Sequence, residues 1–290
     1  MPLLESLQAI WPVLAIVAVF GLVVGSFLNV VILRLPVRLE YDWRKEAKAL
    51  LGQSDVGPEV EPPGLAFPPS RCASCQTTIK PWHNIPVFGW LWLRGRCAAC
   101  GSSISIQYPL IELACGFGTA LVVWRLGLSW EAAAALLLTW SLLALAAIDA
   151  RHRLLPDVMT LPLLWIGLGL SLMGIFTDAH SSILGAIGGY LSLWAVFQLF
   201  LLLTGKEGMG YGDFKLFAAL GAWLGWQKLP LIILLASAAG ALVGGALLMT
   251  GRLANDRALP FGPYLAAAGW IALLWGDQLV GAYLHIADFG

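Results

Sequence analysis

Long apolar stretches recur through most of this chain, and short polar segments separate them. The stretches cover residues 10–33, 109–126, 131–148, 158–177, 183–203, 214–227, 230–250 and 262–286. Most of them reach the ~20 apolar residues that a helix needs to cross a bilayer. The pattern therefore predicts an all-α polytopic membrane protein with about eight transmembrane helices.

One long polar stretch, residues 34–108, interrupts this pattern. It contains a charged segment, a Pro- and Gly-rich linker at 57–69, and a cysteine-containing module that runs from Arg71 to about Tyr108. We therefore expect a first transmembrane anchor (1–33), a polar domain inserted after it (34–108) and a transmembrane domain (109–290).

Composition agrees with a membrane protein and excludes one class of partner. Hydrophobic residues make up 59% of the chain and charged residues only 12%, about half the charged share of a soluble domain. The 17 basic and 17 acidic residues balance each other. A nucleic-acid partner therefore has no electrostatic support.

The basic residues indicate how the predicted spans are oriented. If the first span runs from outside to inside, all of the 17 basic residues except Arg125 and Lys228 fall in inside segments. An excess of Lys and Arg marks the cytoplasmic side of membrane proteins. The polar domain is therefore predicted to lie in the cytoplasm, which is a reducing compartment.

Four cysteines of the polar domain form two CxxC pairs, Cys72 with Cys75 and Cys97 with Cys100. Two such pairs place four thiolates around one zinc ion in a closed, structural site. Two disulfides or four unrelated thiols are the alternatives, and the reducing compartment opposes disulfides. We therefore expect a small zinc-ribbon-like domain in which these cysteines bind structural zinc.

Two aspartates stand at the borders of apolar stretches, where a carboxylate is costly unless function requires it. Asp149 ends the stretch at 131–148, and Asp213 precedes the stretch at 214–227. The predicted topology places both at the same face of the membrane. An N-cap role is an alternative for Asp213, but a carboxylate at the C-terminal end of a helix, as at Asp149, is electrostatically unfavourable.

The length of the stretch after Asp213 favours a catalytic role. About 14 residues extend roughly 21 Å as a helix, less than the ~30 Å hydrocarbon core, so Asp213 is expected to lie below the membrane surface. Two close carboxylates share one proton. One then activates water as general base while the other protonates the carbonyl and later the leaving amine. This is the chemistry of an aspartyl peptidase.

Two other classes of function fit parts of the pattern. A transporter or channel could bind protons or cations at the border aspartates, but the sequence lacks repeated halves and acidic groups near the middle of a span. A non-catalytic membrane scaffold could display the cysteine module to a partner. The scaffold hypothesis does not explain why two aspartates stand at the same membrane face.

The sequence resembles the bifunctional type IV prepilin leader peptidases and N-methyltransferases of bacterial inner membranes. The resemblance extends over nearly the whole chain. It rests on the two CxxC pairs and on the segments GSFLNVVILRLP (25–36), PWHNIPVFGWLWLRGRC (81–97), YPLIEL (108–113), LPD (155–157), GMGYGDFK (208–215) and PFGPYLA (260–266).

The resemblance implies that Asp149 and Asp213 are the two catalytic aspartates of the family. It implies prepilin and pseudopilin substrates that are cleaved at the cytoplasmic border of the membrane, for type IV pili and type II secretion. It also implies methylation of the new N-terminal residue by S-adenosylmethionine, for which the sequence shows no binding signature. A peptidase without methylation is the alternative. Membrane lipid would surround the chain, and its oligomeric state is left open.

Overall fold

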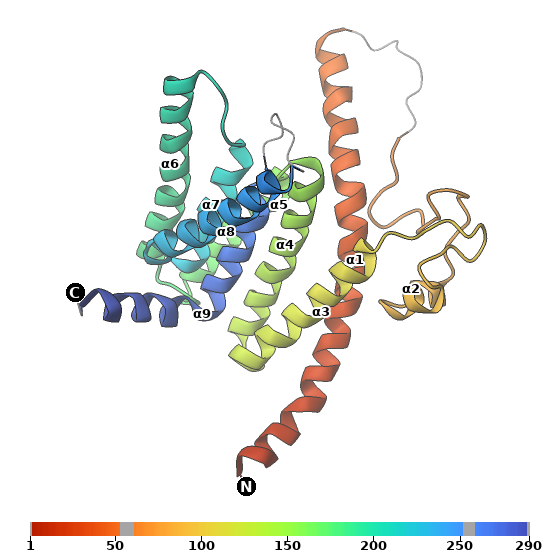
Figure 1. Ribbon diagram of the computed structural model, residues 1–290, viewed down its shortest axis with the longest axis horizontal. Helices are drawn as coiled ribbons and strands as arrows, with labels where there is room; N and C mark the ends of the chain where they lie inside the picture. The colour runs from red at the N-terminus through yellow and green to blue at the C-terminus, as the bar shows by residue number, and fades with distance from the viewer. Residues whose placement is uncertain (1, 53–60, 252–258, 289–290) are drawn as a thin grey trace. The chain divides into compact units, whose positions relative to one another are not determined.

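The computed structural model describes residues 2–52, 61–251 and 259–288, and almost all of their regular structure is helical (Figure 1). The elements in chain order are α1 (Pro2–Leu50), η1 (Pro81–Asn84), α2 (Phe88–Trp92), α3 (Gln107–Leu126), α4 (Trp130–His152), α5 (Asp157–Ser171), α6 (Ala179–Thr204), α7 (Tyr211–Leu224), η2 (Trp226–Lys228), α8 (Leu229–Met249) and α9 (Gly262–Asp288). The predicted all-α class is confirmed.

Six of the described segments are long and apolar enough to cross a membrane. They are Trp11–Leu50, Gln107–Leu126, Trp130–His152, Ala179–Thr204, Trp226–Met249 and Gly262–Ala282. The remaining two predicted spans correspond to shorter helices, α5 with 15 residues and α7 with 14. The protein is therefore a multi-pass membrane protein, whereas the number of eight crossings stays a prediction.

The chain divides into two compact units, and the first unit is Met1–Leu128. Here α1 packs along α3. A Cβ atom at Gly25 would lie 2.7 Å from Cα of Glu112, so the glycine permits the two helix backbones to approach closely. The buried Asn29 donates a hydrogen bond to the carbonyl of Tyr108 over 3.1 Å. These contacts hold the beginning of α3 against the middle of α1.

Residues 61–106 join the two helices of this unit. They contain η1, α2 and two isolated antiparallel bridges, Arg71 with Thr78 and Arg96 with Ser103. Each bridge closes a turn that contains one CxxC pair. The expected small cysteine module after the first helix is therefore confirmed.

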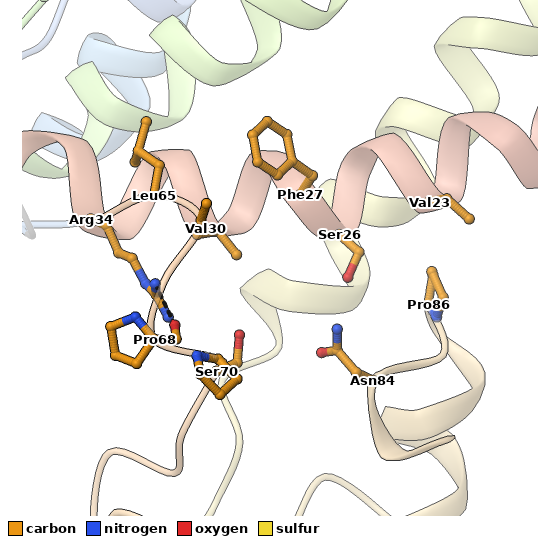
Figure 2. Close-up of a pocket in the computed structure, with 12 residues that line it drawn as sticks. Val23, Ser26, Phe27, Val30, Arg34, Leu65, Pro68, Ser70, Asn84 and Pro86 are labelled. Carbon is orange, nitrogen blue, oxygen red and sulfur yellow. Dashed lines mark hydrogen bonds between the residues drawn. The ribbon is translucent and has the colours of Figure 1, made fainter. Parts of the chain in front are cut away.

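Arg34 attaches the linker before this module to α1. Its guanidinium donates hydrogen bonds to the carbonyl oxygens of Gly64, at 2.7 Å, and of Pro68, at 2.9 Å. Figure 2 shows Arg34 extending toward Pro68 at one end of a hollow between α1 and residues 65–70. The basic residue thus has a local structural role in satisfying backbone carbonyls.

The second unit, Ser129–Gly290, is built around the short helix α7. Helices α5, α6 and α9 pack against α7, and its residues from Asp213 are buried except Lys215. A Cβ atom at Gly221 of α7 would overlap the carbonyl of Gly185 in α6. Trp223 donates a hydrogen bond of 2.7 Å to the carbonyl of Leu163 in α5. A helix enclosed by protein is apolar all round, so α7 resembles a membrane span in sequence although it contacts other helices.

Candidate active site and metal centre

Both border aspartates belong to the second unit, and both are buried. Asp149 lies in the last turn of α4 and Asp213 in the first turn of α7. Asp149 is only 6% exposed and Asp213 only 7%. The structure thus places both aspartates at buried helix ends of the same compact unit, and their pairing stays a prediction.

The beginning of α9 binds Asp149. The backbone N–H of Gly262 donates a buried hydrogen bond of 3.0 Å to Oδ2 of Asp149. A helix N-terminus has free N–H groups and a positive dipole end, so α9 offsets the unfavourable position of this carboxylate at the end of α4. A Cβ atom at residue 262 would lie 2.6 Å from the same oxygen. Sequence reasoning identified the PFGPYLA segment but assigned no role to Gly262, because the contact joins residues far apart in the chain.

Asp213 has a different environment. It is the third residue of α7, and Gly210 occupies the N-cap position, so the N-cap alternative for Asp213 is wrong. Oδ1 of Asp213 is buried and has no hydrogen-bond partner within the described part of the chain. Buried polar atoms are nearly always paired. This exception leaves an oxygen able to hold a proton or to bind water.

Lys215 does not neutralise either aspartate of the pair. Its ammonium lies 2.7 Å from both carboxylate oxygens of Asp157, the first residue of α5. This ion pair connects α5 with α7 close to Asp213. Lys215 is therefore the ion-pair partner of Asp157 and not of Asp149 or Asp213.

The four predicted metal ligands gather in the first unit. The sulfur atoms of Cys72, Cys75, Cys97 and Cys100 lie within 4.8 Å of one another, and those of Cys72 and Cys100 are 3.8 Å apart. Thiolates bound tetrahedrally at ~2.3 Å from one zinc ion are about 3.8 Å apart. All four are free cysteines. The cluster has the ligand type and spacing to bind a metal ion.

Hydrogen bonds act on the cysteines of the cluster, and at Cys72 they favour the thiolate form that metal binding requires. The backbone N–H of Cys75 and the hydroxyl of Ser102 lower the pKa of the Cys72 thiol to about 5. At Cys97 the backbone N–H groups of Cys100 and Ala99 act in the same direction, but desolvation and the sulfurs of Cys72 and Cys100 outweigh them and raise its pKa. Because the thiolate is the metal ligand, the low pKa of Cys72 prepares one ligand of the cluster for a cation.

Fold and site together define a polytopic membrane protein with a buried aspartate pair and a four-cysteine module. Residues 19–126 match the family model described as the bacterial peptidase A24 N-terminal domain, and residues 136–245 match that of the type IV leader peptidase family. No solved structure matches the chain.

Curated relatives extend this match along the chain. A relative from Stutzerimonas stutzeri is 54% identical over 273 residues, 93% of each chain. One from Pseudomonas aeruginosa is 51% identical over 291 residues, 100% of each chain, and one from Aeromonas hydrophila is 50% identical over 274 residues, 94% of each chain. Each is named prepilin leader peptidase/N-methyltransferase. This chain belongs to the type IV leader peptidase family, as its motifs predicted.

Proposed function

We propose that this chain is a prepilin leader peptidase and N-methyltransferase in which Asp149 and Asp213 form the catalytic pair. Family membership supports the two activities. The observation that supports the residues is the burial of two carboxyl groups in one compact unit, in the last turn of α4 and the first turn of α7. Hydrolysis of a peptide bond by an aspartate pair requires the two carboxyl groups to lie close enough to share a proton, and this is part of the proposal.

The surroundings of the two carboxyl groups suggest how the roles divide. A hydrogen bond from a backbone N–H favours a carboxylate, and Asp149 accepts one from Gly262. We therefore assign Asp149 as the general base that removes a proton from the attacking water. Asp213 holds the shared proton and donates it to the scissile carbonyl oxygen. The proton that Asp149 takes from water is then passed to the leaving amine.

Location and partners follow from the same family. We place the chain in the bacterial inner membrane, surrounded by lipid, with residues 34–108 as a cytoplasmic zinc-binding domain and residues 109–290 as the peptidase domain. Its substrates are prepilins and pseudopilins, whose leader is removed at the cytoplasmic border. The excess of basic residues on that side supports this orientation.

The cysteine cluster suits structural zinc. Four thiolates complete a tetrahedral site and leave no open position for substrate, so the metal would fasten the two cysteine turns to each other. A module this small has little core of its own, and metal binding supplies its folding energy. S-adenosylmethionine is the proposed methyl donor.

Two substitutions test the catalytic pair. Purified Asp149→Asn and Asp213→Asn proteins are incubated with a prepilin in detergent, and the products are analysed by mass spectrometry. Each change is expected to lower the cleavage rate by at least about 10³-fold, since a dyad acts as a unit. Asp277→Asn is the matched control, because Asp277 is an exposed residue of α9 that pairs with Lys228. Normal cleavage by either Asn variant of the pair removes that residue from the proposal.

A further inference from the structure

A cavity in the first unit lies between the cysteine module and the beginning of α3. Its volume is about 470 Å³, within the ~300–1,000 Å³ range of small-molecule sites. Its walls come from both cysteine turns, η1, α2 and the first turns of α3. The cavity belongs to the first unit, whereas the aspartate pair belongs to the second.

Glu112 is the buried acidic residue in the wall of this cavity. It is 6% exposed, and its Oε2 accepts a hydrogen bond of 2.7 Å from the backbone N–H of Val87. No basic side chain of the described residues forms an ion pair with it. A carboxylate at the end of an apolar helix is expensive and usually functional. Its charge favours a cationic ligand in the cavity.

The backbone beside Glu112 adopts a rare conformation. Val87 has φ 62° and ψ −51°, and the N–H of Phe88 donates to the carbonyl of Pro86 over 2.6 Å. These values describe a γ-turn of the uncommon, strained type, and positive φ is especially unfavourable for a β-branched residue. The turn directs the Val87 N–H to the carboxylate. Strain of this kind persists where the surroundings enforce it, often at functional sites.

Other wall residues suit a small ligand that carries a positive group, a negative group and an aromatic ring. Trp90 is half-buried in the wall, and its indole N–H donates to the carbonyl of Ile104 over 3.2 Å, which fixes the ring. Arg71 and Lys80 are basic residues of the same wall. The cavity thus combines an anion for a cationic group, cations for a carboxylate and an indole for a flat ring.

The neighbouring hollow of Figure 2 lacks this combination. It is smaller, about 360 Å³, and its walls are mostly apolar side chains and prolines. Its cation, Arg34, already donates to two carbonyl groups, and no acidic residue lines it. A cationic ligand is therefore better matched by the cavity that contains Glu112.

We propose that the Glu112 cavity binds S-adenosylmethionine, with Glu112 as the anionic partner of its sulfonium group. The proposal rests on the methyltransferase activity proposed above. In the reaction, the carbon–sulfur bond of the sulfonium breaks while a carbon–nitrogen bond forms to the freed N-terminal amine. Sulfur keeps the bonding electron pair and becomes a neutral thioether, and the nitrogen releases a proton to water.

The direct test is equilibrium binding of radiolabelled S-adenosylmethionine to the purified full-length protein in detergent, without peptide. Glu112→Gln keeps the size of the side chain and an acceptor for the Val87 N–H but removes the charge. Binding is expected to weaken about 10- to 100-fold. Glu61→Gln is the matched control, because Glu61 is an exposed carboxylate of the linker that does not line the cavity, and it is expected to bind like the wild type.

A comparison of ligands tests the role of the charge. S-adenosylhomocysteine has nearly the same shape but no sulfonium charge. The wild type is expected to prefer S-adenosylmethionine, and Glu112→Gln is expected to lose most of this preference. If both proteins show the same ratio of affinities, Glu112 is not the partner of the sulfonium and the proposal is wrong.

A second variant covers the case in which Glu112→Gln does not fold. Thr78→Trp places a large ring at an exposed position of the cavity wall and leaves Glu112 unchanged. It is expected to block binding of S-adenosylmethionine, while the zinc content of the protein stays at the wild-type level. Unchanged binding overturns the proposal.

The cationic partner of Glu112 could instead be the freed N-terminal ammonium of the pilin. In that case Glu112→Gln would bind S-adenosylmethionine normally and show a raised KM for a mature pilin peptide, which contradicts our assignment. Leader cleavage is measured on the same samples. If the wild-type protein cleaves prepilin but never methylates it, the methyltransferase function itself is refuted. If the wild type methylates but Glu112→Gln and Thr78→Trp bind S-adenosylmethionine as the wild type does, only the proposed binding site is refuted.

Discussion

The contact between Gly262 and Asp149 predicts that one added methyl group should impair cleavage. In the structure the N–H of Gly262 lies 3.0 Å from Oδ2 of Asp149. A Cβ atom at position 262 would lie 2.6 Å from this oxygen and 3.1 Å from Cγ. Both distances are shorter than van der Waals contact allows. In Gly262→Ala, the Asp149 side chain or the first turn of α9 must therefore move, and the hydrogen bond is lost or lengthened.

The size of the effect follows from the kind of hydrogen bond. A hydrogen bond to a charged group contributes about 1.5–3 kcal/mol. If the bond orients Asp149 in the transition state, its loss lowers kcat about 10- to 160-fold, since each ~1.36 kcal/mol is a factor of ten. KM should change little, because Gly262 binds the base rather than the substrate.

The assay is single-turnover and steady-state cleavage of a prepilin by the purified variant. Gly245→Ala is the matched control, since no atom lies within 4 Å of a Cβ built at that position in α8. Thermal unfolding in detergent checks that both variants are folded. A folded Gly262→Ala protein with the wild-type kcat would refute the idea that this amide positions the base.

Three further changes test the metal centre, the helix packing and the cost of the buried acid. Cys97→Ser should lower the zinc content measured by elemental analysis. Cys115→Ser is the control, at a buried position of α3 outside the cluster, and should keep the wild-type zinc content. Equal zinc content in both variants would reject the ligand set. Gly221→Ala should destabilise the protein by about 1–3 kcal/mol or more, because its methyl group would overlap the Gly185 carbonyl, and an unchanged unfolding temperature would contradict this packing. Asp213→Leu should abolish cleavage yet raise stability by about 1–3 kcal/mol, because it removes a buried oxygen without a partner; a less stable folded variant would argue against that cost.

Sequence alone could predict the features that depend on local pattern. Long apolar runs predict membrane helices wherever they occur, and two CxxC pairs predict that four sulfurs meet because the ligand chemistry requires it. Asp149 and Asp213 could be chosen because each interrupts an apolar region at a border. These predictions need only the order of residues along the chain.

The remaining features depend on contacts between distant segments. An apolar stretch of 14 residues reads the same whether its helix faces lipid or other helices, so the burial of α7 among α5, α6 and α9 could not be foreseen. The bond from Gly262 joins residues 113 positions apart. The turn at Val87 that binds Glu112 contains no glycine, and therefore lacks the sequence signal that usually marks positive φ.

Each unit retains a buried carboxyl group that its fold does not neutralise, and this is the strongest physical reason to seek chemistry in both. Stability alone would favour apolar side chains at these positions. Oδ1 of Asp213 is a buried polar atom without a partner in the described residues, which costs about 1–3 kcal/mol, and Glu112 accepts a backbone hydrogen bond but forms no ion pair with a basic side chain of those residues. Close helix packing offsets that cost. In the second unit the helices cross at Gly185 and Gly221, and in the first unit α1 approaches the backbone of Glu112 closely. Residues kept against stability are expected at sites of function. Because Asp213 and Glu112 lie in different compact units, the two activities of one chain can depend on separate acidic residues, and substitutions should be able to remove one activity without the other.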